Sequence, residues 1–137
     1  MEDSTTNYPS VKLVLVGEAG TGKTCIFTRL CKGKFDSETT SSIGALGESI
    51  TLTCSNNDKL KFNIWDTAGQ EIYHSVNKIF YTDAEIVLIV YDVTVPKSFE
   101  TIKSYWYNEV SNTCVDTASK LHYIILPLIC STVLGWK

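Results

Sequence analysis

The chain has 137 residues, a length typical of one domain. Its content of 44% hydrophobic and 20% charged residues excludes global disorder, and its net charge of −3 excludes a general attraction to nucleic acid or to anionic membranes. The five cysteines are odd in number and have no C-x-x-C spacing, so we expect reduced thiols in a cytoplasmic protein, not a disulfide framework or a zinc site.

Two nearly continuous apolar runs predict buried parallel strands. Val11–Val16 and Ile86–Tyr91 are rich in β-branched residues, and a helix-like stretch follows each of them. Ile50–Cys54 and Leu60–Ile64 instead alternate between apolar and polar residues, and the turn-forming residues 55–58 (Ser-Asn-Asn-Asp) lie between them. This pattern predicts an antiparallel hairpin with one wetter face, as is typical of a sheet edge.

Two segments have the apolar spacing of amphipathic helices, Lys23–Lys32 and Ser98–Ser111. The expected apolar faces are Ile26, Phe27 and Leu30 in the first helix and Phe99, Ile102, Trp106 and Val110 in the second. Residues 121–126 are expected to form a further strand. The resulting order of elements predicts an α/β fold with a doubly wound, mostly parallel sheet and one antiparallel edge strand.

The two ends of the chain differ in character. Residues 1–10 are polar and do not resemble a secretory signal, so we expect a flexible N-terminus. Residues 121–136 carry no formal charge if His122 is neutral, but a helix of this length would fall short of the hydrocarbon core and Pro127 would break it. We therefore expect a strand followed by an apolar, divergent tail over residues 127–137, with no stable membrane anchor.

Residues 17–24 read GEAGTGKT directly after the first strand and before the first helix. This fits G-x-x-x-x-G-K-[ST], in which glycines let backbone N–H groups converge on a phosphate and the helix start adds further donors. Lys23 would supply a charge to the β- and γ-phosphates, and Thr24 a hydroxyl ligand for Mg²⁺. A Gly-rich turn that only caps a helix is the alternative. The predicted nucleotide-binding residues of this segment are Gly17, Glu18, Ala19, Gly20, Thr21, Gly22, Lys23, Thr24 and the following Cys25.

A second polar string, WDTAGQE, occupies residues 65–71 at the end of the second hairpin strand. Asp66 can hold Mg²⁺ through water, Gly69 can offer its backbone N–H to a γ-phosphate, and Gln70 can orient a water for in-line attack. Taken alone, the string could be a solvated turn. Its occurrence together with the phosphate loop of residues 17–24 favours a nucleotide site.

With these strings the chain resembles the Ras-like small GTPases, and their Rab branch in particular. The supporting strings are GEAGTGKT, WDTAGQE, FYTDA at residues 80–84 and VYDVT at residues 90–94 followed by Ser98-Phe99. The resemblance implies a P-loop NTPase fold, binding of GTP and GDP with Mg²⁺, slow hydrolysis and two nucleotide-dependent switch loops. It also implies that Phe35 packs against guanine, that Ser42 stands for the Mg²⁺-ligating threonine of the first switch, and that Gln70 is the catalytic, water-orienting residue. A core anchor below the first helix is the alternative for Phe35, and an ordinary loop serine is the alternative for Ser42.

The family pattern breaks at two places. Residues 43–47 read IGALG where Rab proteins have a string close to I-G-V-D-F, so an acidic and an aromatic residue of the partner surface are gone, although Trp65 remains. After the strand expected at residues 121–126 the chain continues Pro-Leu-Ile-Cys, not the N-K-x-D that reads guanine. That loss would weaken guanine binding by roughly two or more powers of ten. We therefore expect a partial small GTPase domain over residues 11–126, incomplete at the C-terminus, without the family's last helix or prenylation cysteines.

The sequence thus predicts a Rab-like molecular switch of vesicle trafficking, a GTPase that uses GTP, GDP and Mg²⁺. The predicted metal ligands are Thr24, Ser42 and Asp66. Arg29, the only arginine, lies in the first helix, so fast turnover would require an arginine from a GTPase-activating protein, which with effectors would dock on the switch loops. We expect a cytoplasmic monomer. Two alternatives stay open: a non-hydrolysing Rab-like interaction fragment without guanine selectivity, and a poorly folded product without a biochemical role.

Overall fold

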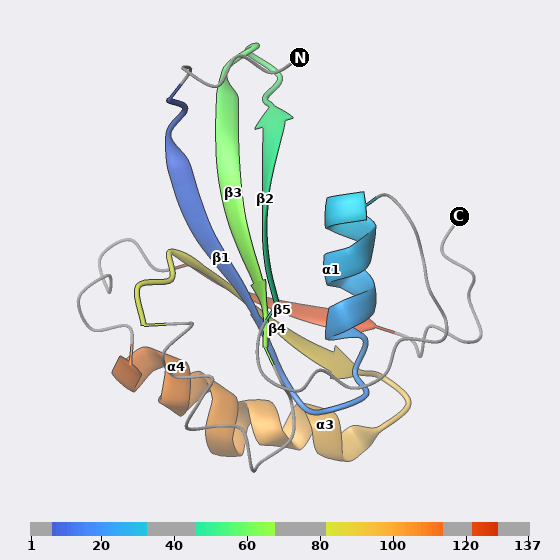
Figure 1. The fold of residues 1–137 in the computed structure, drawn as a ribbon. Coiled ribbons are helices and arrows are strands. Elements are labelled where there is room, and N and C mark those ends of the chain that lie inside the picture. Colours follow the sequence, from blue (N-terminus) through green and yellow to red (C-terminus); the bar gives the residue numbers. More distant parts are fainter. Residues whose placement is uncertain (1–6, 33–45, 68–81, 114–121, 129–137) are drawn as a thin grey trace.

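The computed structural model of the chain describes residues 7–32, 46–67, 82–113 and 122–128. Within these ranges, five strands form one sheet in the order β2-β3-β1-β4-β5 (Figure 1). The strands are β1 (Ser10–Val16), β2 (Leu46–Thr53), β3 (Lys59–Asp66), β4 (Ile86–Asp92) and β5 (His122–Leu128). The pairs β1–β3, β1–β4 and β4–β5 are parallel, and β2 pairs antiparallel with β3. The prediction of a mostly parallel sheet with an antiparallel edge strand is therefore confirmed.

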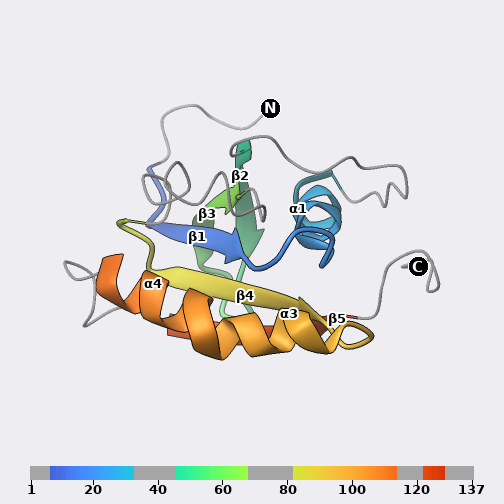
Figure 2. The same cartoon turned by 90° about the horizontal axis from the view of Figure 1, so that it is seen from below.

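The helices cover the two faces of the sheet. Helix α1 (Lys23–Lys32) lies on one face, and a long helix lies on the other (Figures 1 and 2). The long helix consists of α3 (Pro96–Thr101), the π-helical η2 (Ile102–Trp106) and α4 (Tyr107–Thr113). It extends two residues beyond each end of the helix expected over residues 98–111. The residues assigned by resemblance to the two switch loops, Ser42, Gly69 and Gln70, lie outside the described residues.

Alternating side chains of the central strands supply two separate cores. Toward the long helix the buried residues are Val14, Val16, Ala84, Val87, Ile89, Ile102, Trp106 and Val110. Toward α1 they are Leu15, Phe27, Ile64 and Val90. Because successive residues of a strand point to opposite faces, the continuous apolar runs of β1 and β4 serve both cores at once.

Two residues expected on apolar helix faces are exposed instead. Leu30 is 43% exposed and Phe99 is 39% exposed. In α1 the buried stripe follows steps of four, from Lys23 to Phe27 to Cys31, which turns Leu30 toward water.

In the long helix the buried core residues Ile102, Trp106 and Val110 are four apart. The turn between them is π-helical, because the backbone N–H of Tyr107 donates to the carbonyl of Ile102, five residues back. Phe99 lies outside this buried stripe, and the centroid of its ring is 4.9 Å from that of Tyr91, with the two ring planes tilted by 58°.

The strand boundaries also differ from expectation at both sheet edges. Strand β2 begins at Leu46, four residues earlier than expected, and its hairpin with β3 closes through the predicted turn, where the N–H of Cys54 donates to the carbonyl of Asp58 at 2.7 Å. Strand β5 continues to Leu128, so Pro127 and Leu128 belong to the sheet and not to the expected tail. Proline is tolerated there because, among the described residues, β5 pairs on one side only.

Candidate functional site

The phosphate loop leaves β1 at Gly17 in a conformation that needs glycine. Gly17, Gly20 and Gly22 have φ angles of 142°, 76° and 98°, which L side chains rarely adopt. A Cβ at Gly17 would lie 2.2 Å from the carbonyl oxygen of Val90, because the loop crosses directly over the backbone of β4. At Gly20 a Cβ would meet nothing within 4 Å, so only the φ angle restricts that position. The motif glycines therefore shape the loop where it leaves the sheet.

Lys23 is folded back onto this loop and removed from water. It is 5% exposed, and its Nζ donates a hydrogen bond of 2.7 Å to the carbonyl oxygen of Glu18. The hydroxyl of Thr21 donates to the same oxygen at 2.8 Å. Burial lowers the pKa of Lys23 from 10.5 to about 8, although the carboxylates of Asp66 and Glu18 counteract the shift. A desolvated ammonium at the start of a helix is a strong reason for an anion to bind here.

Thr24 and Asp66 bring a hydroxyl and a carboxylate together beside that lysine. The Oγ1 of Thr24 donates to Oδ2 of Asp66 at 2.6 Å, across 42 positions of sequence. The parallel pairing of β1 and β3 sets Leu15 opposite Asp66, and the hydroxyl of Thr67 donates to the carbonyl of Leu15 at 2.6 Å. Asp66 is fully buried as a result. The sheet register therefore brings together two residues that the sequence named separately as Mg²⁺ ligands, and their role in metal binding stays a prediction.

The oxygen ligands of this pair fit Mg²⁺. That ion prefers hard oxygen ligands and is usually held by one or two protein groups together with phosphate oxygens and water. Within the described ranges there is no cluster of three or more His, Cys, Asp or Glu side chains that could enclose a metal on its own. Thr24 and Asp66 therefore offer one hydroxyl and one carboxylate oxygen at the same point, which matches the few protein groups that usually hold Mg²⁺ bound to a polyphosphate.

The remaining predicted residues divide between described and undescribed parts of the chain. Ala19 and Gly20 form the exposed tip of the loop, and Cys25 follows in the first turn of α1 with a half-buried side chain. Phe35, Ser42, Gly69 and Gln70 lie outside the described residues. Their roles in guanine packing, metal binding and water orientation therefore stay predictions.

Three residues near the loop were not predicted as site residues. The indole Nε1 of Trp106 donates to Oε1 of Glu18 at 3.2 Å, joining the loop to the long helix. Near the loop tip, a cavity of about 170 Å³ is also lined by Asp92 and Ser98 at the end of β4. The VYDVT string with Ser98 indicated that this segment matters, but apolar spacing alone assigned Trp106 to the core.

The sequence that follows β5, where the family reads guanine, differs from the family pattern. Strand β5 ends at Leu128, whose register partner on β4 is Asp92. Residues 129–132 then read ICST, without the asparagine, lysine or aspartate of N-K-x-D. The strand ends two residues later than expected. The sequence after its observed end still lacks N-K-x-D.

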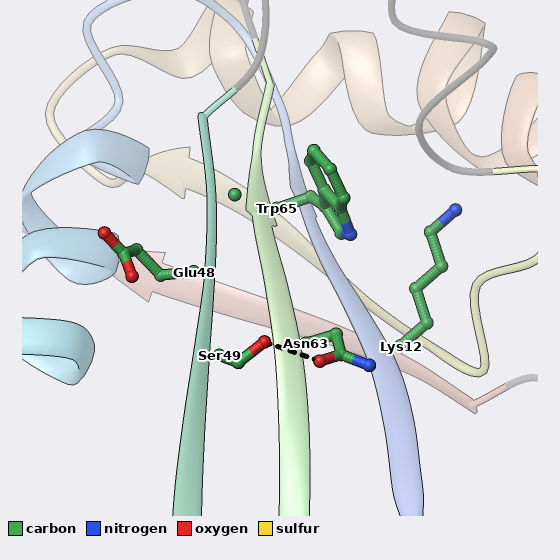
Figure 3. A pocket seen from close by; sticks show the side chains of 6 residues that line it. Lys12, Glu48, Ser49, Asn63 and Trp65 are labelled. Carbon is green, nitrogen blue, oxygen red and sulfur yellow. Dashed lines mark hydrogen bonds between the residues drawn. The ribbon is translucent and has the colours of Figure 1, made fainter. Parts of the chain in front are cut away.

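On the hairpin, Gly47 occupies the position where the Rab string has an aromatic residue. Gly47 faces Trp65 across β2 and β3, and a Cβ at Gly47 would lie 2.7 Å from the indole ring. The indole therefore rests against the backbone of β2, beside an open hollow of about 620 Å³ that Lys12 and Asn63 also line (Figure 3). Glu48 extends from the opposite side of β2.

Comparison with known proteins places the chain in a family. A family model described as Ras family matches residues 12–126, so the chain belongs to the Ras family. Among curated proteins it is similar to Ras-related protein RHN1 of Nicotiana plumbaginifolia, with 44% identity over 110 residues that cover 80% of this chain and 54% of that protein. It is 45% identical to Ras-related protein Rab5A of Oryza sativa subsp. japonica over 101 residues, which cover 74% of this chain and 49% of that protein.

A further relative is Ras-related protein Rab-18 of Caenorhabditis briggsae, with 36% identity over 115 residues that cover 84% of this chain and 56% of that protein. The chain spans about half the length of the curated relatives it matches. The predicted resemblance to Rab-type proteins is therefore confirmed. In the described part of the chain, no helix is both long and apolar enough to cross a membrane.

Proposed function

We propose that this chain is a Rab-like molecular switch of vesicle trafficking that binds guanine nucleotide with Mg²⁺ and hydrolyses GTP slowly. The observation that carries the proposal is the buried ammonium of Lys23, held by the carbonyl of Glu18 beside the Thr24–Asp66 pair. A charge removed from water is costly unless a counter-charge binds it. A polyphosphate with its cation would satisfy the lysine, the hydroxyl and the carboxylate together.

The described residues have separate tasks in this mechanism. The loop's backbone N–H groups and Lys23 would hold the β- and γ-phosphates, while Thr24 would ligate the cation and Asp66 would hold it through water. Bound Mg²⁺ would neutralise charge on the phosphate oxygens. For the undescribed residues we keep the predicted roles: Ser42 as a second hydroxyl ligand, and Gly69 and Gln70 at the γ-phosphate and the attacking water.

A nucleotide titration tests the proposal. The full chain would be titrated with GTP, GDP and ATP, with and without Mg²⁺, by calorimetry. We expect Mg²⁺-dependent binding of GTP and GDP, which Lys23→Met abolishes while Lys32→Met, at an exposed lysine of the same helix, preserves it. Binding that survives Lys23→Met would contradict the site.

One alternative function is favoured by specific observations. The ICST string after β5 and the glycine opposite Trp65 depart from the family at the base site and at the partner surface. A non-hydrolysing interaction fragment would melt cooperatively yet bind no nucleotide in the same titration. Equal weak binding of GTP and ATP would indicate a phosphate-only site, and the lack of any cooperative melt would indicate a poorly folded product.

A further inference from the structure

The side chain of Glu18 and the long helix meet beneath the phosphate loop. The indole of Trp106 is fully buried, and its Nε1 donates to Oε1 of Glu18 at 3.2 Å, within the range of a protein hydrogen bond. The two residues are 88 positions apart in sequence. A hydrogen bond from a buried donor to a carboxylate is one of the stronger neutral-to-ion contacts in proteins.

The backbone of Glu18 performs a second task at the same point. Its carbonyl oxygen accepts hydrogen bonds from Nζ of Lys23 at 2.7 Å and from the hydroxyl of Thr21 at 2.8 Å. The Glu18 residue whose carbonyl positions Lys23 is therefore also anchored to the long helix through its side chain. A shift of the Glu18 side chain would be transmitted directly to that carbonyl.

Trp106 is a rigid point of attachment for this contact. It is the last residue of the π-helical segment and belongs to the core with Val87, Ile102 and Val110. The ring of Tyr105 packs against it edge-on at 4.9 Å. π-helical turns inside α-helices are frequently found at functional sites, and here the turn keeps Trp106 in line with the core stripe of the long helix.

The charge of the Glu18 carboxylate also acts on Tyr105, a second side chain of the long helix. The pKa of Tyr105 is raised to about 12 by burial first, and then by the negative charges of Glu109 and Glu18. The field of Glu18 therefore acts into the helix as well as on Lys23.

We propose that Glu18 and Trp106 are positioning residues, which through their hydrogen bond hold the phosphate loop in its binding conformation and couple it to the long helix. Neither side chain is assigned a contact with the nucleotide. The proposal rests on the proposed function in one respect only, namely that the loop binds phosphate. The position of the loop itself can be measured without nucleotide.

The first test is hydrogen exchange of the loop amides in the nucleotide-free chain. Trp106→Phe removes the N–H and keeps an aromatic ring, and Glu18→Ala removes the acceptor without opening a core cavity. Each should accelerate exchange of residues 18–24 about tenfold, which corresponds to the loss of one hydrogen bond to a charged group. Glu18→Gln, which keeps the acceptor oxygen, should recover most of the protection.

Val110→Ala is the matched control for loss of core packing. It lies in the same core, one turn further along the helix, so it should destabilise the chain while exchange at residues 18–24 changes no more than exchange elsewhere. If Trp106→Phe resembles Val110→Ala, or if Glu18→Ala leaves loop exchange unchanged, the proposal is overturned. This result is independent of whether the chain binds nucleotide.

The second test is the dissociation rate of a fluorescent GDP analogue in the presence of Mg²⁺. Trp106→Phe and Glu18→Ala should each speed dissociation about tenfold, and the double variant should be no faster than either single one, because both remove the same contact. Fully multiplicative effects would contradict a direct link. A wild-type chain that retains no nucleotide would refute the proposed function, and the exchange experiment would still decide on the link.

Discussion

The two ends of the predicted nucleotide site differ in how they are built. At the phosphate end, loop glycines with positive φ, a buried lysine and a hydroxyl–carboxylate pair meet where β1 and β3 end. At the guanine end, β5 ends at Leu128 and no base-reading string follows it. The phosphate end depends largely on backbone groups and sheet register, whereas base reading depends on a few side chains in one loop. A chain can therefore keep the first and lose the second.

The largest expected effect concerns the backbone at the phosphate end. Gly17→Ala should reduce the free energy of unfolding by about 4 kcal/mol, because its Cβ would lie 2.2 Å from the carbonyl oxygen of Val90. Gly20→Ala is the control, with a positive φ but open space around it, and should cost about 1 kcal/mol. Urea denaturation of both variants would measure this. Equal losses would mean that the loop does not cross β4 as closely as described.

The second prediction gives opposite signs for binding and stability. Lys23→Met should weaken GTP binding at least about a hundredfold, as expected for loss of a charge-assisted contact with polyphosphate. The nucleotide-free variant should nevertheless be more stable at pH 7, by about 2 kcal/mol. The lowering of the lysine pKa from 10.5 to about 8 is the net of burial and the opposing carboxylates, and it corresponds to a net penalty of about 3 kcal/mol for the charged form. Loss of the hydrogen bond to Glu18 would offset about 1 kcal/mol of this gain. Thermal melts without nucleotide would check the sign, and a destabilised variant would contradict it.

The third prediction tests whether the guanine end can be restored. A variant with Ile129→Asn, Cys130→Lys and Thr132→Asp recreates N-K-x-D directly after β5. We expect GTP affinity to rise about tenfold to a hundredfold with ATP affinity unchanged, because only guanine offers two donors to the new carboxylate. The same variant with Thr132 kept is the control. A parallel gain for ATP would show that the substitutions act on stability and not on base recognition.

The smallest effect is a pH dependence of the phosphate end. In the nucleotide-free chain Lys23 has a pKa of about 8. Bound phosphates would keep the lysine protonated, so above that pH the chain must take up a proton when it binds nucleotide. Nucleotide affinity should be flat below pH 8 and fall up to about tenfold per pH unit above it. Lys23→Arg keeps its charge throughout and should lack this slope. A wild-type affinity that stays constant to pH 9.5 would refute the role of burial.

The same linkage fixes the pH dependence of stability without nucleotide. Folding lowers the lysine pKa, so the folded chain releases its proton first as pH rises. Between about pH 8 and 10.5 the unfolded chain therefore binds more protons, and the contribution of Lys23 to stability increases across that window.

Local patterns were sufficient for much of the fold, including the strand, loop and helix that carry the predicted phosphate site. The turn at residues 55–58, the β-branched runs and the GKT string each act over a few residues, and the structure confirms the elements they predicted. Thr24 and Asp66 were named as Mg²⁺ ligands from separate strings, and they lie together because the parallel strands β1 and β3 end at the same edge of the sheet.

Other features depend on distances that no local pattern encodes. The hydrogen bond from Trp106 to Glu18 spans 88 positions, and the spacing of apolar residues identified that tryptophan only as core. The exposure of Leu30 and Phe99 follows from buried stripes with steps of four, which differ from the steps of three and four that an ideal amphipathic helix predicts. The strand expected over residues 121–126 continues to Leu128, because an outer strand accepts the proline at position 127.

The glycine beneath Trp65 also restricts how the hairpin can move. A slip of one residue between β2 and β3 would turn every side chain of β2 to the other face. A slip of two residues in one direction would place Ser49 opposite Trp65, in the position that Gly47 now occupies. A Cβ at that position would lie 2.7 Å from the indole ring, which is too close. The two strands are therefore locked against sliding. A conformational signal that passes through this edge would have to bend or rotate the hairpin as a rigid unit.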